Sequence, residues 1–173
     1  MNTEVLLDSI ISLIPAIVIA IVAFYFFKSH LEETQRERNF RLRKKNRDQS
    51  LPLMLQAYER YTLFLERISP GRLLSRVKPI GENKYDYENL LVKTIEQEFE
   101  HNLSQQIYVS TDCWRAIKAS KNATINLIRQ SSMSEHITNA KKLQEHILTE
   151  LLEKDAPSET GLSYIRSEVR KLT

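Results

Sequence analysis

The feature that most constrains this chain is an apolar run at 5–27, which is followed at once by Lys28. No charged residue occurs at 10–27, and consecutive aromatic residues close the run. About 20 apolar residues in a helix cover roughly 30 Å, the thickness of the hydrocarbon core of a bilayer. The run therefore predicts a transmembrane helix at 5–27, preceded by a short external N-terminus at 1–4.

Two other interpretations of this run are a cleaved signal peptide and a buried helix of a globular core. A signal peptide needs a basic N-terminal region, a shorter apolar segment and small residues at its cleavage site. Here Glu4 and Asp8 make the N-terminal region acidic, and bulky aromatic residues end the run. A core helix carries a polar stripe, which this run lacks. The sequence favours a retained single-pass anchor.

Basic residues lie on one side of the run only, and they predict its orientation. None precedes the run, and eight follow it: Lys28, Arg36, Arg38, Arg41, Arg43, Lys44, Lys45 and Arg47. Flanks that are rich in Lys and Arg stay in the cytoplasm. We therefore expect a location in the plasma (inner) membrane of a bacterium, with the N-terminus outside and the C-terminal part cytoplasmic.

The segment at 28–50 contains neither Gly nor Pro and is expected to continue the helix as a basic juxtamembrane stalk. One interpretation is that its basic residues bind lipid headgroups, which requires the segment to lie flat. A perpendicular helix would hold 36–47 roughly 13–30 Å from the interface, beyond a Debye length of about 8 Å. The favoured interpretation is a solvated stalk and a topology signal. The lipid bilayer is a predicted partner in both cases.

The remaining residues, 51–173, predict one all-α cytoplasmic domain. Apolar positions recur at spacings of three and four, and Ser, Pro, Gly, Asn and Asp punctuate them, so helices are expected near 52–68, 70–77, 85–109, 112–131, 134–154 and 158–172. No stretch alternates with a period of two over a useful length. The simplest arrangement is an antiparallel bundle of four main helices plus short ones.

Composition argues against several function classes. Residues 49–173 hold seventeen basic and sixteen acidic residues, whereas a nucleic-acid-binding domain usually carries a basic excess. The single cysteine, Cys113, forms no internal disulfide and no thiolate metal cluster. The chain has three glycines, no phosphate-binding loop and no serine in a nucleophile elbow. We expect no catalytic residue, no cofactor and no nucleic-acid partner.

Glu98 and His101 have the Glu-x-x-His spacing that di-iron helical bundles use. Such a site needs a second copy of the motif and two further carboxylates. Neither of the two later histidines has a glutamate three residues before it. We therefore expect no metal site, and we expect the histidines at the surface.

Asn102 and Gln106 lie on the same arc of the predicted helix 85–109 as its apolar stripe (Leu91, Ile95 and Phe99). A buried polar side chain without a partner costs about 1–3 kcal/mol. One interpretation is that Asn102 and Gln106, with Glu98 and His101 beside them, contact a protein partner, another protomer or a ligand. The other is an internal hydrogen bond that fixes the register of the bundle.

Three features together resemble an uncharacterised family (a domain of unknown function) of short, single-pass, N-terminally anchored helical bacterial membrane proteins. They are the anchor, the stretch YERYTLFLERISPGRLLSR at 58–76, and EFEHNLSQQIYVS at 98–110 with Trp114 close behind. The resemblance implies this architecture and no particular activity.

These observations predict a membrane-anchored cytoplasmic helical interaction or scaffold module that binds a protein partner or forms a homo-oligomer. The alternative is a ligand-binding sensor or enzyme domain with a pocket beside helix 85–109. A bound metal or metabolite would favour that alternative.

Overall fold

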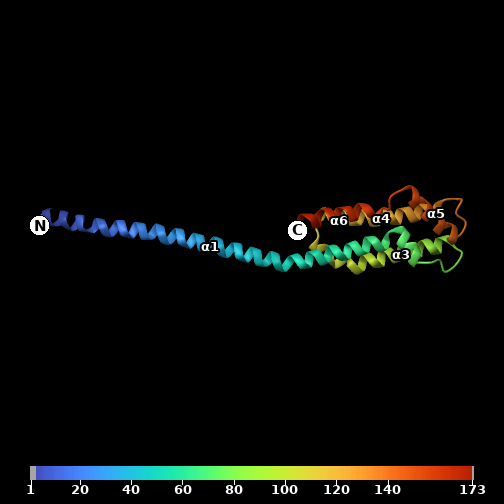
Figure 1. Cartoon of the computed structure of the whole chain (residues 1–173), viewed down its shortest axis with the longest axis horizontal. Helices are drawn as coiled ribbons and strands as arrows, with labels where there is room; N and C mark the ends of the chain where they lie inside the picture. The colour runs from blue at the N-terminus through green and yellow to red at the C-terminus, as the bar shows by residue number, and fades with distance from the viewer. Residues whose placement is uncertain (1–2, 173) are drawn as a thin grey trace. The chain divides into compact units, whose positions relative to one another are not determined.

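The structure, a computed structural model, describes the backbone of residues 3–172 and the side chains of 17–28, 35, 37–38, 40–42, 44–45 and 48–172. Every regular element in this described part is a helix, which confirms the all-α prediction. In chain order they are α1 (Thr3–Ile68), α2 (Pro70–Arg76), α3 (Lys84–Asn102), the 3-10 helix η1 (Leu103–Tyr108), α4 (Thr111–Met133), α5 (Ala140–Glu153) and α6 (Ser158–Leu172) (Figure 1). The chain divides into two compact units, Met1–Gln49 and Ser50–Thr173.

The predicted transmembrane helix is not supported. No helix in the described part of the chain is long and apolar enough to cross a membrane. The apolar residues whose side chains are described, 17–27, rise about 16 Å as a helix, roughly half of the thickness that a span must cover. The side chains of 5–16 lie outside the described residues. This finding contradicts the predicted single-pass location in the plasma membrane. The predicted orientation depends on that location and is therefore contradicted as well.

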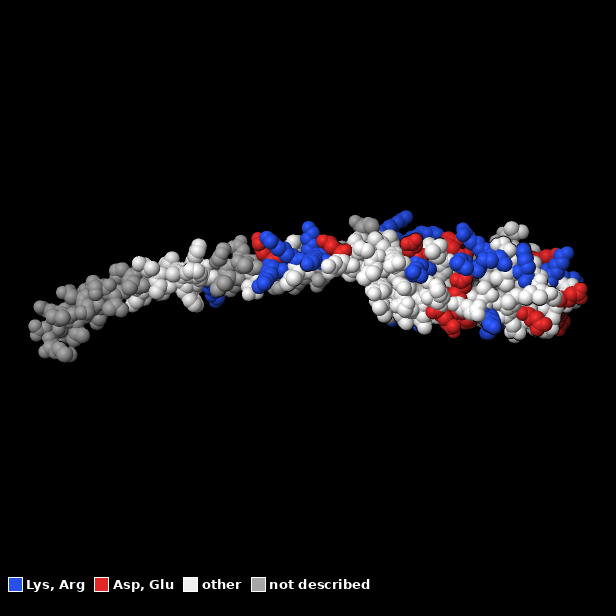
Figure 2. Space-filling view, turned by 90° about the horizontal axis from the view of Figure 1, so that it is seen from below, with Lys and Arg blue, Asp and Glu red and all other residues white. Residues whose placement is uncertain are grey.

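The basic segment at 28–50 is helical throughout, as part of α1. Lys28, Arg38, Arg41, Lys44 and Lys45 are exposed, and blue and red side chains mingle on this segment in Figure 2. The other three predicted basic residues, Arg36, Arg43 and Arg47, have side chains outside the described set. One ion pair at helical spacing joins the Arg41 guanidinium to the Glu37 carboxylate at 3.2 Å. An exposed pair of this kind contributes at most about 1 kcal/mol.

The break that the sequence predicts at 50–52 does not occur, because α1 continues to Ile68. A proline inside a helix removes one hydrogen bond and costs about 3 kcal/mol. Around Pro52, the flanks at 41–49 and 53–66 contain neither Gly nor Pro. Both flanks therefore keep the helical conformation across the proline.

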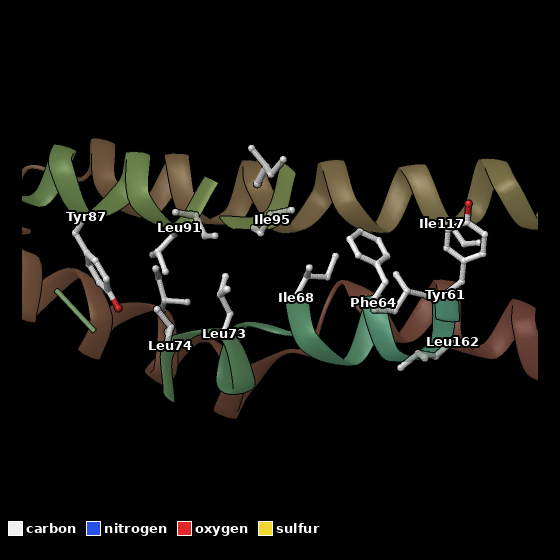
Figure 3. Packing of buried hydrophobic residues seen from close by; sticks show 14 of the residues in the cluster. Tyr61, Phe64, Ile68, Leu73, Leu74, Tyr87, Leu91, Ile95, Ile117 and Leu162 are labelled. Atoms are coloured by element: carbon white, nitrogen blue, oxygen red, sulfur yellow. The ribbon is translucent and has the colours of Figure 1, made fainter. Parts of the chain in front are cut away.

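The last part of α1, 50–68, supplies the centre of the core of Ser50–Thr173. Tyr61, Phe64, Leu65 and Ile68 are fully buried. Figure 3 shows Tyr61, Phe64 and Ile68 facing the helices around them, which contribute Leu73, Leu74, Tyr87, Leu91, Ile95, Ile117 and Leu162. Full burial of a large apolar side chain stabilises a fold by about 1.5–3 kcal/mol. The helical-bundle prediction for this part of the chain is confirmed.

Paired contacts fix the directions of the helices in this bundle. Tyr61 reaches Asn102 while Arg67 reaches Glu98, so α3 runs antiparallel to the end of α1. In the same way α4 runs antiparallel to α3, since Lys121 pairs with Glu96 and Arg129 with Glu88. Helix α6 returns antiparallel along α4, from Ser120 beside Gly161 to Ser110 beside Glu168. Figure 1 shows α4 and α6 side by side.

Gly161 allows α6 to approach its neighbours closely. Its backbone N–H donates to Ser120 Oγ at 3.0 Å, which joins α6 directly to α4. A Cβ atom at this position would lie 2.8 Å from Leu65 Cδ1 and 2.9 Å from Ser120 Oγ. Only a residue without a side chain fits this contact.

The helix predicted at 134–154 begins later, at Ala140. The Asn139 side chain caps it by accepting from the backbone N–H of Lys142 at 2.9 Å. The preceding segment is held to the loop before α3, because Ala140 N–H donates to the Glu82 carbonyl and Lys84 Nζ donates to the Ser134 carbonyl. The sequence pattern places serines at the expected start, but the chain makes a turn at Glu135 and His136, and the tertiary hydrogen bonds hold this non-helical path.

The helix predicted at 85–109 ends as an α-helix at Asn102 and continues as η1. Leu103 and Ile107 continue the spacing of four that runs through Leu91 and Ile95, and they are 40% and 75% exposed. A 3-10 helix has three residues per turn, so Leu103 and Ile107 do not share one face. Neither side chain belongs to the core cluster that contains Leu91 and Ile95.

Candidate functional site

An open recess of about 540 Å³ lies at one end of Ser50–Thr173, where 50–58 of α1, the η1–α4 junction and the end of α6 meet. Its walls are largely apolar, and the side chains that define it are Met54, Tyr58, Ile107, Val109, Glu168 and Leu172. Ligand-binding pockets in proteins commonly measure about 300–1,000 Å³ and combine apolar walls with a few polar groups. The recess has both properties.

Local structure explains how these side chains come together. Ser50, Met54 and Tyr58 recur at a spacing of four and therefore share one face of α1. Lys171 and Leu172 follow Glu168 by one helical turn on α6. Between them the chain is extended at Val109 and Ser110, and the Ser110 hydroxyl caps α4 by accepting from Cys113 N–H at 3.1 Å. The end of η1, the start of α4 and the end of α6 therefore lie close together at this bend.

A single carboxylate, that of Glu168, forms the polar floor of the recess. The Tyr58 hydroxyl donates to its Oε2 at 2.6 Å, and the Ser110 hydroxyl donates to its Oε1. The buried Cys113 thiol lies near enough to this side chain for the Glu168 charge to raise the pKa of the thiol. Glu168 is half-buried, and no ion pair joins it to a basic residue in the part of the chain that the structure describes.

The groups that face Glu168 stay protonated at neutral pH. Burial raises the pKa of the Tyr58 hydroxyl well above its ordinary value, and the hydrogen bond to Glu168 raises that pKa further. Burial, with the nearby Glu168 charge, raises the pKa of the Cys113 thiol to about 12. A reactive cysteine needs a lowered pKa. Tyr58 and Cys113 are therefore neutral hydrogen-bond donors, and the arrangement is suited to binding rather than to nucleophilic chemistry.

The residues predicted as partner or register contacts lie elsewhere, on α3 and η1. The Glu98 carboxylate pairs with Arg67 at 2.7 Å and with Arg76 at 3.1 Å, so it links α3 to α1 and α2. His101 is exposed and lines, with Glu98, a shallow polar depression of about 390 Å³. Among the described residues, no group of three or more His, Cys, Asp or Glu side chains could hold a metal ion.

Asn102 is buried and has partners within the fold. Its side-chain amide donates to the Glu98 backbone carbonyl at 2.8 Å, and the backbone carbonyl of Asn102 accepts from the Tyr61 hydroxyl at 3.0 Å. These bonds sit where α3 gives way to η1. Gln106, which was expected beside Asn102, is exposed on η1. The side-chain bond of Asn102 lies within α3 and joins no second helix, and Asn102 is buried whereas Gln106 is exposed.

Sequence reasoning missed the recess because its parts are far apart in the chain. Tyr58 and Glu168 are 110 positions apart, and Ser110 and Glu168 are 58 apart. One signal was present: Glu168 stands three residues after Ile165 and four before Leu172, on the edge of the apolar stripe of the last helix. A carboxylate at such a position needs polar partners from a neighbouring element.

Comparison with protein families gives one match. The model of a family described as "Family of unknown function (DUF7935)" matches residues 4–172. Nothing matches the chain among curated proteins or among solved structures. The expected resemblance to an uncharacterised family is confirmed, while its single-pass membrane character is not supported.

Proposed function

The chain belongs to DUF7935, a family of unknown function, and we propose from its own geometry that it is a non-enzymatic helical interaction module. In this proposal the recess at the end of Ser50–Thr173 receives a side chain from a protein partner. The helices around the recess act as a fixed frame, and no bond of the partner is made or broken.

The observation that carries this proposal is the apolar rim of the recess. Ile107 lines the opening and is 75% exposed, and Leu103 on the same short helix is 40% exposed. Apolar side chains that gather around a concave surface are typical of protein interaction sites. A partner that covers Ile107 and fills the recess would remove this apolar surface from water.

A firm floor supports the same interpretation. Tyr58 is only 4% exposed and belongs to the core cluster, while its hydroxyl is fixed by Glu168. A preformed pocket binds at a lower entropic cost than one that must be ordered on binding. The protonated donors around Glu168 supply recognition and no activated nucleophile.

The test is site-specific photocrosslinking of the full chain in its native cells. A photoreactive phenylalanine analogue replaces Ile107 in one variant and Met133 in a matched control, because Met133 is equally exposed (77%) and lies at the far end of α4. We expect one discrete adduct from the Ile107 variant and none from the control. The purified partner should then bind the native chain and lose affinity for Ile107→Asp. No adduct at Ile107, or the same adducts at both positions, would refute the proposal.

A second candidate function is a ligand-binding sensor that uses the depression beside α3. The observation that favours it is the gathering of Arg76, Glu98 and His101 with Thr94 and Gln97 around about 390 Å³. Native mass spectrometry of the purified chain tests this function. A bound metabolite that is lost in His101→Ala, but retained in the control His146→Ala, would favour the sensor over the interaction module.

A further inference from the structure

Within the described part of the chain, the hydrogen bonds to the Glu168 carboxylate come from neutral groups. Hydroxyls from Tyr58 and Ser110 donate to it, and the buried Cys113 thiol lies near its charge. Lys171 lines the same recess, yet no ion pair joins it to Glu168 among the described residues. The other partly buried carboxylates of this unit that form ion pairs face arginine side chains, as Glu98 and Glu88 do, or lysine side chains, as Glu96 and Glu150 do. Glu168 therefore differs from them in having neutral donors where they have a cation.

Glu168 lines the open recess together with Ile107, Met54 and Leu172, so a ligand bound there would meet apolar side chains and the carboxylate at once. An ionised carboxylate offers about four lone-pair sites, and the two hydroxyl donors leave some of them for a ligand. The aromatic ring of Tyr108 also lines the recess, and aromatic faces attract cations.

These features select one kind of occupant. An anionic group would meet the negative charge of Glu168, and a purely aliphatic group would leave that charge without a counterion. A basic side chain fits both parts, because Lys and Arg carry a cationic head on a methylene stem that packs against apolar surface. Hydrogen bonds to charged groups are also stronger than those between neutral groups.

We propose that the partner inserts a basic side chain, Lys or Arg, whose stem packs on the apolar walls and whose cationic head pairs with Glu168. This inference rests on the proposed function, since it specifies the chemistry that the recess recognises. It makes Glu168 the specificity-determining residue, with Tyr58 and Ser110 as the residues that position its carboxylate.

The test uses three probes of equal chain length against the full chain: hexylammonium, hexanol and hexanoate. Amide signals of 107–110 and 168–172 are followed by NMR during each titration. We expect hexylammonium to bind about tenfold more tightly than hexanol, and hexanoate to bind most weakly. Raising the salt concentration should reduce the preference for hexylammonium, because ions screen the pair.

Two variants test whether Glu168 is the source of the preference for hexylammonium over hexanol. Glu168→Gln keeps the shape of the side chain and one acceptor oxygen, while its amide N–H can donate to the hydroxyl that faces the other position. It should bind hexylammonium and hexanol to within about twofold of each other. The control Glu153→Gln removes the same charge from α5, away from the recess, and should retain the tenfold preference. Unchanged amide signals from the rest of the bundle show that Glu168→Gln is folded.

The outcomes separate this inference from the proposed function. Equal binding of hexylammonium and hexanol by the native chain, or a preference that survives Glu168→Gln, would overturn the inference and leave the recess as an apolar docking site. The inference would also be overturned if no probe shifted the amide signals of the recess while the Ile107 variant still gave its adduct. Sequencing of that adduct provides a second readout: a partner segment without Lys or Arg near the cross-link would also overturn the inference.

Discussion

Two stretches of α1 are both rich in apolar residues, yet their surroundings are opposite. At 17–27 the described aromatic side chains are exposed, with Phe24 at 64% and Phe26 at 69%. At 50–68 Phe64 and Tyr61 are 0% exposed and form the centre of a core. Both stretches adopt the same helix, so helix formation and burial are separate outcomes. Burial at 50–68 depends on the faces that α3, α4 and α6 present to it.

The largest expected effect is the difference between the same substitution in these two stretches. Phe64→Ala removes a fully buried ring that packs 5.7 Å from the ring of Phe99, and should lower the free energy of unfolding by about 3–5 kcal/mol. Phe24→Ala acts on an exposed ring and should change it by less than about 0.5 kcal/mol. Urea denaturation followed by the fluorescence of Trp114 measures both. Equal losses would show that 17–27 contributes to the folded core as much as 50–68 does.

A second expectation concerns the fit between α6 and the buried stretch of α1. Gly161→Ala places a methyl group 2.8 Å from Leu65 Cδ1, and the resulting shift should cost about 1–3 kcal/mol of folding free energy. Gly81→Ala is the matched control, because no atom lies within 4 Å of the added methyl group. Thermal unfolding of both variants gives the comparison. A Gly161→Ala protein as stable as the control would mean that α6 does not pack closely on 50–68.

A third expectation concerns alkaline pH. Burial raises the pKa of Tyr61 and of Tyr87 to about 12, above the ordinary value of 10.0. The folded state therefore holds these protons when the unfolded chain releases them, so the stabilisation is complete below about pH 10 and is lost as pH rises towards 12. Urea midpoints measured from pH 8 upward should fall in this window.

The tyrosine origin of this fall can be checked by substitution. Tyr87→Phe removes one titrating group and should make the decline shallower, while Leu63→Ala, an exposed substitution with no titrating group, should leave its slope unchanged. A decline of the same slope in Tyr87→Phe would assign it to other groups.

The smallest expected effect lies outside the core. Arg41→Gln breaks the exposed pair with Glu37 and should change thermal stability by less than about 0.5 kcal/mol. Circular dichroism of the full chain measures the helix content and its melting. A loss comparable to that of Gly161→Ala would show that residues around 41 take part in the cooperative unit, so that this unit would extend along α1 beyond 50–68.

Much of the secondary structure followed from local patterns. The helix at 158–172 coincides with α6, and those expected at 70–77 and 112–131 lie within two residues of α2 and α4 at either end. Capping residues explain this success, since Ser110 and Asn83 accept backbone N–H groups at the starts of α4 and α3. The continuation of α1 through Pro52 and the late start of α5 were missed. Both depend on energies that a local pattern does not contain.

The candidate site could not be predicted from the sequence in the same way. The spacing to His101 pointed to Glu98, and the position on an apolar arc of the predicted helix pointed to Asn102. Both side chains have partners inside the fold. The recess instead joins positions from three distant parts of the chain around Glu168. Its apolar rim includes Ile107, which is 75% exposed although a spacing of four links it to the buried Leu91 and Ile95.

By itself the sequence determined that this chain is helical, where most of its helices begin and end, and which face of each one is apolar. Those properties arise from interactions between residues three or four positions apart. Tertiary structure decided which apolar faces are buried, where α3 becomes η1, and that Tyr58, Ser110 and Glu168 meet. Such contacts are selected by packing and by the need to satisfy buried polar groups, and both depend on residues that are distant in the sequence.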